Sequence, residues 1–89
     1  TNGIIKNAII KIYPNPFKDH IQIEILQKNK LDVEITLINI TGKKILEKNY
    51  PNLRYSFIKV SDVSDLPSGI YLLKIKIGEQ VFQQSISKI

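Results

Sequence analysis

The sequence predicts an all-β fold, a seven-stranded antiparallel β-sandwich, from three observations. Apolar residues recur at every second position, which gives a strand one face toward a core and one toward water. Eighteen of the 89 residues are isoleucine, whose β-branched side chain suits the pleated surface of a sheet. Turn-forming residues separate the alternating segments roughly every 8–12 residues, a spacing typical of β-sandwiches.

The first two strands lie on either side of a proline-containing loop. Residues 8–13 form the first predicted strand, which stops there because Pro14 and Pro16 cannot donate to a hydrogen-bonded ladder. In residues 21–26, which form the second strand, Ile21, Ile23 and Ile25 alternate with Gln22 and Glu24. The polar residues 28–30 are predicted to separate it from the third.

The third and fourth strands form a predicted hairpin. Apolar residues alternate from Leu31 to Leu37, and Thr41-Gly42-Lys43 forms the turn because Gly42 can adopt a positive φ. The alternation slips by one residue over 37–40, which predicts either a bulge or a strand end covered on both faces. Pro51-Asn52 is predicted to end the fourth strand.

The last three strands complete the pattern. Residues 58–60 place two apolar residues on one face of the fifth strand. The longest connection, residues 62–69, is expected to contain a short helical or 3₁₀ turn before the sixth strand, in which Tyr71 begins the inward face. Gly78-Glu79 fits a two-residue hairpin turn, and the seventh strand runs from Gln80 to Lys88.

The composition argues against several classes of function. The chain has no cysteine and one histidine, His20, so disulfides, thiolate nucleophiles and multi-histidine metal sites are excluded. The acidic residues are scattered, and Asp62 with Asp65 would give calcium far fewer than the about 6–8 oxygen ligands it prefers. We expect no enzymatic activity, cofactor or metal.

The charge pattern does not favour a polyanionic partner such as a nucleic acid. The net charge is +5, and 12 of the 13 cations are lysine, which often only solvates a strand face, whereas arginine reads phosphate and guanine bidentately. No apolar run approaches the roughly 20 residues of a membrane span. We therefore expect neither nucleic-acid binding nor membrane insertion.

Two loop motifs remain. Tyr13-Pro14-Asn15-Pro16-Phe17 is a stiff corner, because the residue before each proline is restricted to extended conformations. Leu66-Pro67-Ser68-Gly69-Ile70-Tyr71 combines a proline turn with a glycine before an apolar strand. On physical grounds alone both are rigid corners.

With these two motifs in this order, the chain resembles the C-terminal sorting domain of the type IX, or Por, secretion system of Bacteroidetes. The resemblance covers about residues 10–89 and includes the turn Ile40-Thr41-Gly42-Lys43. It makes residues 8–89 the sorting domain and residues 1–7 a leader or linker remnant. The final strand departs from the family in having one lysine, Lys88, where a lysine-rich end is common. The motif residues are Pro14, Asn15, Pro16, Gly42, Leu66, Pro67, Gly69, Tyr71 and Lys88.

The resemblance implies a non-catalytic, immunoglobulin-like sandwich that directs an upstream cargo protein out of the cell. Such a domain passes through the periplasm and is recognised by the outer-membrane translocon. A surface sortase usually removes it and attaches the cargo to anionic lipopolysaccharide, so the cargo reaches the cell surface or the medium. We expect residues 80–88 to be an exposed edge that a partner strand can join.

Two alternatives stay open. One is an immunoglobulin-like carbohydrate-binding or adhesive module of a surface enzyme, with Tyr50, Tyr55 and Phe57 as candidate stacking aromatics. The other concerns assembly, because exposed sheet edges also permit a strand-mediated homodimer.

Overall fold

The computed structural model describes residues 8–89, and the expected leader or linker at residues 1–7 lies outside the described part. The described chain consists of antiparallel strands joined by turns and contains no helix. The strands are β1 (Ala8–Tyr13), β2 (Ile21–Asn39), β3 (Lys44–Val60), β4 (Gly69–Ile77) and β5 (Gln80–Lys88).

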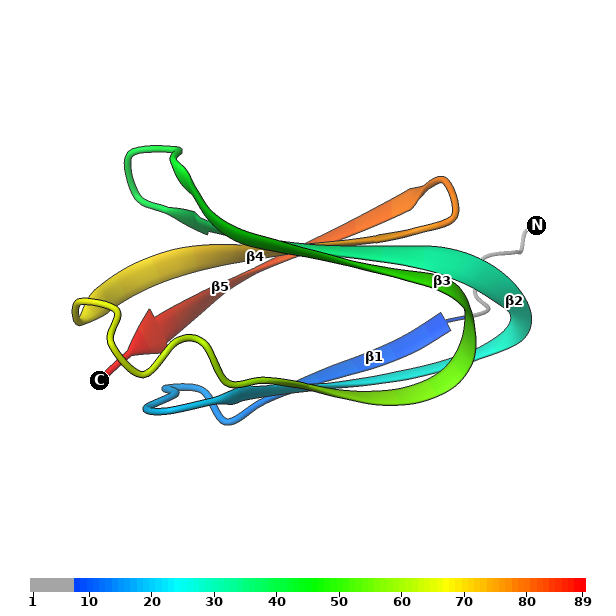
Figure 1. Cartoon of the computed structure of the whole chain (residues 1–89), viewed down its shortest axis with the longest axis horizontal. Coiled ribbons are helices and arrows are strands. Elements are labelled where there is room, and N and C mark those ends of the chain that lie inside the picture. The colour runs from blue at the N-terminus through cyan, green and yellow to red at the C-terminus, as the bar shows by residue number, and fades with distance from the viewer. Residues whose placement is uncertain (1–7) are drawn as a thin grey trace.

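Two of these strands are long enough to run through both layers of the molecule (Figure 1). The first layer holds β1, residues 21–26 of β2 and residues 55–60 of β3. The second layer holds the later half of β2, the earlier half of β3, β4 and β5. Counted by layer, the chain forms sheets of 3 and 4 strands, so the predicted seven-stranded antiparallel sandwich is confirmed.

The predicted strand ends at residues 28–30 and 51–52 are wrong, because both segments lie inside continuous strands. There β2 and β3 bend together from one layer to the other, and their pairing resumes after shifts in register. Pro51 is tolerated because this part of β3 pairs with β2 alone and leaves its other edge open. Leu31, expected to face the core, lies in the bend and is 38% exposed.

The remaining turns follow the sequence more closely. Gly42 has a φ of 90° and Gly78 a φ of 60°, as their turns require. The side chain of Asn39 closes the β2–β3 turn, because its Oδ1 accepts hydrogen bonds from the backbone N–H groups of Thr41 and Lys43. The bulge lies in the partner strand beside the slip: Leu37 pairs with Leu46 and Ile38 with Lys44, which leaves one extra residue in β3, whereas β2 pairs with β4 there without a shift.

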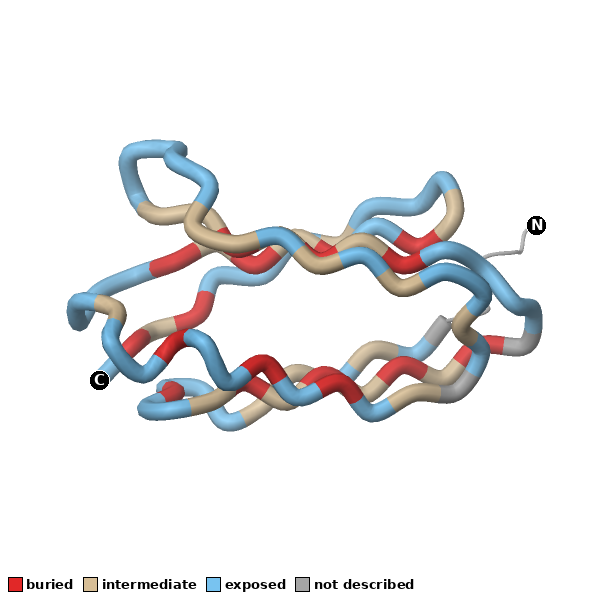
Figure 2. Tube along the Cα trace, viewed as in Figure 1, coloured by how far each residue is buried: buried red, intermediate tan, exposed pale blue. Residues whose placement is uncertain are grey.

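The core lies between the two layers, where the inward faces of the strands meet (Figure 2). The alternating apolar residues of β2 and β4 supply most of it, as their periodicity predicts. Over residues 8–89 no helix is long and apolar enough to cross a membrane. The core residues are Phe17, Ile21, Ile23, Ile25, Val33, Ile35, Leu37, Ile58, Val60, Val63, Tyr71, Leu73, Ile75, Ile77 and Ile86.

Candidate functional site

The two loop motifs lie at the same end of the sandwich, where β5 also ends (Figure 1). Phe17, the last residue of the first motif, has an exposed fraction of 0%. Its ring lies edge-on to the ring of Tyr71, the last residue of the second motif, with the centroids 6.2 Å apart. Aromatic pairs prefer this arrangement, in which the positive edge of one ring meets the negative face of the other. The two motifs are therefore in direct contact.

The second motif is closed by its own tyrosine. The Tyr71 hydroxyl donates a 2.6 Å hydrogen bond to the carbonyl oxygen of Pro67, which ties the start of β4 to the turn before it. Immunoglobulin-like domains use a similar tyrosine corner. The connection before β4 contains a single i→i+3 turn, in which the Leu66 N–H donates to the Val63 oxygen at 3.2 Å, and no longer helical segment forms over residues 62–69. Gly69 has a φ of 150°.

The first motif holds the end of β5. The backbone N–H of Phe17 donates to the Ser87 oxygen at 2.8 Å, and the N–H of Ile89 donates to the Phe17 oxygen at 2.9 Å. The side chain of Asn15 adds a third bond, because its Oδ1 accepts from the Ser87 N–H at 3.0 Å. Phe17 and Lys88 thereby form a parallel bridge. The corner acts as a very short strand beside β5.

The motif residues at the corners differ in how far they are buried. Pro14, Asn15, Pro16, Pro67 and Gly69 are exposed around the buried aromatic pair, with Leu66 half-buried beneath them.

Lys88 and Gly42 are arranged differently. Lys88 is only 8% exposed, and its Nζ donates to the Ile89 oxygen at 3.1 Å, so its ammonium group does not project outward. Gly42 is in the exposed β2–β3 turn, which lines a hollow together with Ile70 and Tyr71 of the second motif. The first motif contains Phe17, but the sequence alone did not assign this residue to the core, and nothing in the sequence pointed to Ser87. The one available signal for a buried anchor was that a large apolar residue directly follows Pro16.

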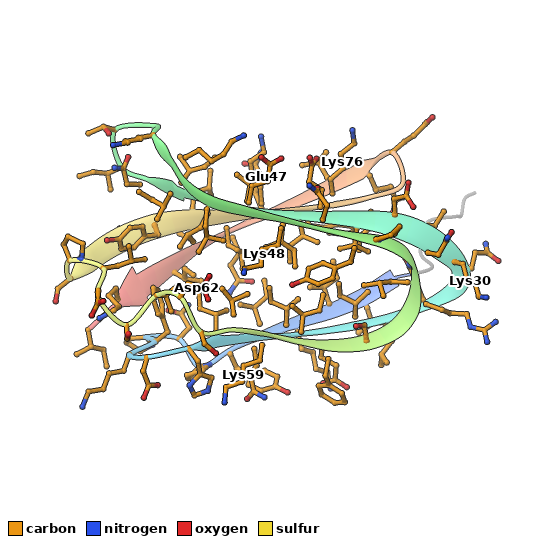
Figure 3. The ribbon with its side chains drawn as sticks, viewed as in Figure 1. Lys30, Glu47, Lys48, Lys59, Asp62 and Lys76 are labelled. Carbon is orange, nitrogen blue, oxygen red and sulfur yellow. The ribbon has the colours of Figure 1, made fainter. Side chains whose placement is uncertain are left out.

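The titratable side chains form isolated surface pairs. The hydrogen bond between His20 Nδ1 and Asp19 Oδ1, 2.9 Å long, lowers the pKa of Asp19. Asp62 pairs with Lys48 at 3.1 Å (Figure 3). Within residues 8–89 no group of three or more histidine, aspartate or glutamate side chains is placed to hold a metal ion.

The outer face of the second layer carries a further pair. Lys44 Nζ lies 2.9 Å from Glu47 Oε1, and this hydrogen bond lowers the pKa of Glu47 and raises the pKa of Lys44. A hollow of about 430 Å³ lies near the bend of β2 and β3, far along the strands from the corners, with Asp32 and Lys76 in its lining. The Oδ1 of Asp32 already accepts a hydrogen bond from the backbone of Asn52.

Comparison with known proteins gives one family. No curated protein matches the chain. The model of a family described as the secretion system C-terminal sorting domain matches residues 11–88. The match begins within β1 and ends with β5, so it includes both corners and the bridge between Phe17 and Lys88. The chain therefore belongs to the family of type IX secretion system C-terminal sorting domains.

Proposed function

We propose that this domain is a non-catalytic sorting signal that directs an upstream cargo protein across the outer membrane through the type IX secretion system. The observation that carries the proposal is the family match over residues 11–88, which contains both corners. Membership in this family implies that the protein carrying the domain is exported and meets the type IX machinery.

The corner end of the sandwich is the surface we propose for recognition by the translocon. A signal that acts by being bound loses least conformational entropy when its shape is fixed beforehand. Here Pro14, Pro16 and Pro67 restrict the exposed backbone, while Phe17 and Tyr71 anchor it from inside. In this proposal the exposed corner residues contact the translocon, and the buried pair of aromatic residues holds the exposed residues in place.

Later steps follow the family pattern. After transit through the periplasm, a surface sortase removes the domain and attaches the cargo to anionic lipopolysaccharide, or the cargo is released into the medium. The chain has no cysteine, so its fold does not depend on disulfide exchange outside the cytoplasm.

A reporter fusion tests the proposal. Residues 1–89 are fused to the C-terminus of a neutral, periplasm-exported reporter in a type IX-competent bacterium, and in a matched strain without the translocon. We expect the reporter on the surface or in the medium of the first strain and in the periplasm of the second. Retention in the periplasm of both strains would refute the sorting function, provided that limited proteolysis shows the domain to be folded.

A second candidate, carbohydrate binding or adhesion, has one observation in its favour. Phe57 is 70% exposed on the outer face of the first layer, where it pairs with Glu24. Tyr50 is half-buried and packs against the core, which does not suit a stacking platform, and the side chain of Tyr55 lies outside the described part. Polysaccharide binding that disappears in Phe57→Ala would support this function.

A further inference from the structure

The strand β5 has an open edge. Its hydrogen-bonded neighbour is β4, and the N–H and carbonyl of Ser87 point away from β4 toward the corner at Asn15 and Phe17. In an antiparallel pair, alternate residues direct their backbone groups to opposite sides. Every second residue before Ser87 therefore presents its N–H and carbonyl to the open edge. These residues are Val81, Gln83 and Ser85.

This edge lacks the charges that usually protect an exposed strand. Residues 80–87 contain no charged side chain, whereas β1 carries Lys11. Charged side chains on an edge strand discourage pairing with another strand. The other edge strand, β3, carries Lys44, Glu47, Lys48, Arg54 and Lys59.

The sandwich is also incompletely covered beside this edge. Gln84 pairs with the buried Leu73 and so belongs to the inward face of β5, yet it is exposed. A cleft of about 160 Å³ opens here between β1 and β5. An engineered apolar cavity of about 150 Å³ holds benzene, so a cleft of this size accepts one large apolar side chain. Its lining residues are Ile10, Ile12, Leu73, Ile75, Phe82, Gln83 and Gln84.

The outer face beside the edge carries two lysines. On the outward positions of β4 and β5 the charged side chains are Lys74, which pairs with Gln83, and Lys76, which pairs with Val81; on its other side Lys76 pairs with Glu34 of β2, so Lys74 is the one without an acidic residue opposite it in the sheet. Figure 3 shows Lys76 projecting from the outer surface of this layer. A strand added next to β5 would turn alternate residues toward these lysines and the others toward the cleft.

From the free backbone groups, the cleft and the two lysines together, we infer that the open side between β1 and β5 binds an extended strand of another protein. The strand adds to β5 through Val81, Gln83 and Ser85. Its side chains alternate between apolar residues, one of which fills the cleft, and acidic residues that face Lys74 and Lys76.

A second copy of this chain fits the site less well. In its own β5, Phe82 already packs against its own core, and the other exposed inward residues, Gln80 and Gln84, are polar. A second β5 would also offer Lys74 and Lys76 no acidic partner, because residues 80–87 contain no charged side chain. The backbone groups, the cleft and the two lysines define the site, and its assignment to a strand of the secretion machinery rests on the proposed function.

Synthetic peptides test the site directly. The probe has the length of β5, 9 residues, and alternates glutamate with valine, leucine and phenylalanine. One control peptide has the same composition without the alternation, and a second replaces each glutamate by lysine. We expect calorimetry to detect binding of the probe and of neither control peptide. In the complex, the amides of Val81, Gln83 and Ser85 should gain protection from hydrogen exchange.

Two substitutions on β5 make the test specific. Gln83→Pro removes an edge N–H without removing a bond to β4, and should weaken binding by about tenfold or more while the domain stays folded. Gln84→Lys places a charge in the cleft and should have a similar effect. Lys59→Gln, on the far edge of the first layer, is the matched control and should bind as the unaltered domain does.

Several outcomes would overturn the inference. These are no binding of the probe at millimolar concentration, equal binding of the three peptides, or protection that maps away from β5. If sedimentation shows a homodimer that Gln83→Pro converts to a monomer, the occupant of the site is a second copy of this chain and not a strand of another protein. If the probe fails to bind but the reporter fusion is exported, this inference falls and the sorting function stands; a reporter retained in the periplasm overturns the sorting function instead.

Discussion

The ring of Phe17 lies edge-on to the ring of Tyr71, with the two planes inclined by 61°. Each ring is also fixed through its own residue, because the Tyr71 hydroxyl bonds to Pro67 and the Phe17 backbone bonds to Ser87 and Ile89. Two loops that are far apart in the sequence are thereby joined to each other and to the end of β5. The two motifs of this family therefore form one structural unit in this chain.

Truncating the central ring should strongly destabilise the domain. We expect Phe17→Ala to lower the free energy of unfolding by about 3–5 kcal/mol, since it removes a fully buried aromatic side chain. That is a large share of the about 4–13 kcal/mol typical of a chain of 89 residues. Chemical denaturation measures the change. The control is Phe57→Ala, 70% exposed, which should change stability by less than about 0.5 kcal/mol; equal losses in both variants would contradict the buried anchor.

The hydroxyl of Tyr71 allows a smaller and more selective test. Tyr71→Phe keeps the ring against Phe17 and removes only the hydrogen bond to Pro67. We expect a loss of about 1 kcal/mol, which lowers the Tm of a domain this small by roughly 4–8 °C. Tyr13→Phe, on the outer face of β1, is the matched control. An unchanged Tm in Tyr71→Phe would mean that this bond is replaced by water without loss.

The Asn15 side chain should act locally on β5. Asn15→Ala removes the acceptor of the Ser87 N–H, whereas the Phe17 backbone bonds to Ser87 and Ile89 remain. We expect the Ser87 amide to exchange hydrogen faster, with a loss in global stability of about 0.5–1.5 kcal/mol at most. Exchange followed residue by residue by NMR makes the comparison, with the Tyr71 amide as internal reference. Uniform acceleration along β4 and β5 would indicate a global effect instead.

The surface pair Lys44–Glu47 gives a prediction about pH. The hydrogen bond from Lys44 holds the pKa of Glu47 below its ordinary value. Because the folded-state pKa of Glu47 is lowered, the pair's contribution is present above the unfolded pKa and is lost as the pH falls through the folded pKa. The raised pKa of Lys44 means that its contribution is lost only as the pH rises through that folded value.

The variant Lys44→Met should therefore raise the pKa of Glu47 toward its ordinary value, as followed by NMR of the side-chain carboxyl carbon. Lys48→Met, which breaks the pair with Asp62, should leave the Glu47 titration where it is. Both members of the Lys44–Glu47 pair are on the surface, so we expect little change in thermal stability. A Glu47 titration that is the same in both variants would show that Lys44 does not set this pKa.

Outside the bend, where Leu31 is exposed, periodicity was enough to predict the inward faces, but not how the strands are connected. Ile21, Ile23 and Ile25 are buried as their alternation requires, because the period of a strand is two whatever its neighbours do. The polar residues 28–30 favour a turn and a solvent-facing bend equally. Whether the ladder continues depends on β3 bending at the same place, which is a tertiary property that the local sequence does not carry.

The candidate site was predictable in its corners and not in its contacts. The prolines signal rigid loops by themselves, but the contact of Phe17 with Tyr71 depends on how the layers meet. The position of Lys88 could have been read from the alternation, because it is two residues after the buried Ile86 and so shares its inward face. A lysine is usually expected to present its charge to solvent, whereas the aliphatic part of the Lys88 side chain is buried here.

The last prediction concerns Gly69, where the backbone itself is the constraint. A Cβ added at Gly69 would meet nothing within 4 Å, so a substitution there introduces no clash, but the φ of 150° is one that other residues rarely adopt. Gly69→Val should therefore destabilise the domain by more than about 1 kcal/mol through backbone strain alone. It should also reduce export of the reporter fusion, because the Pro67–Tyr71 turn begins to open. Gly69→Ala is the matched variant: strain at φ predicts a clear loss in both, with the larger loss in the β-branched valine. If both variants melt at the temperature of the unaltered domain, Gly69 does not need its positive φ, and the second corner is held by Tyr71 and its hydrogen bond.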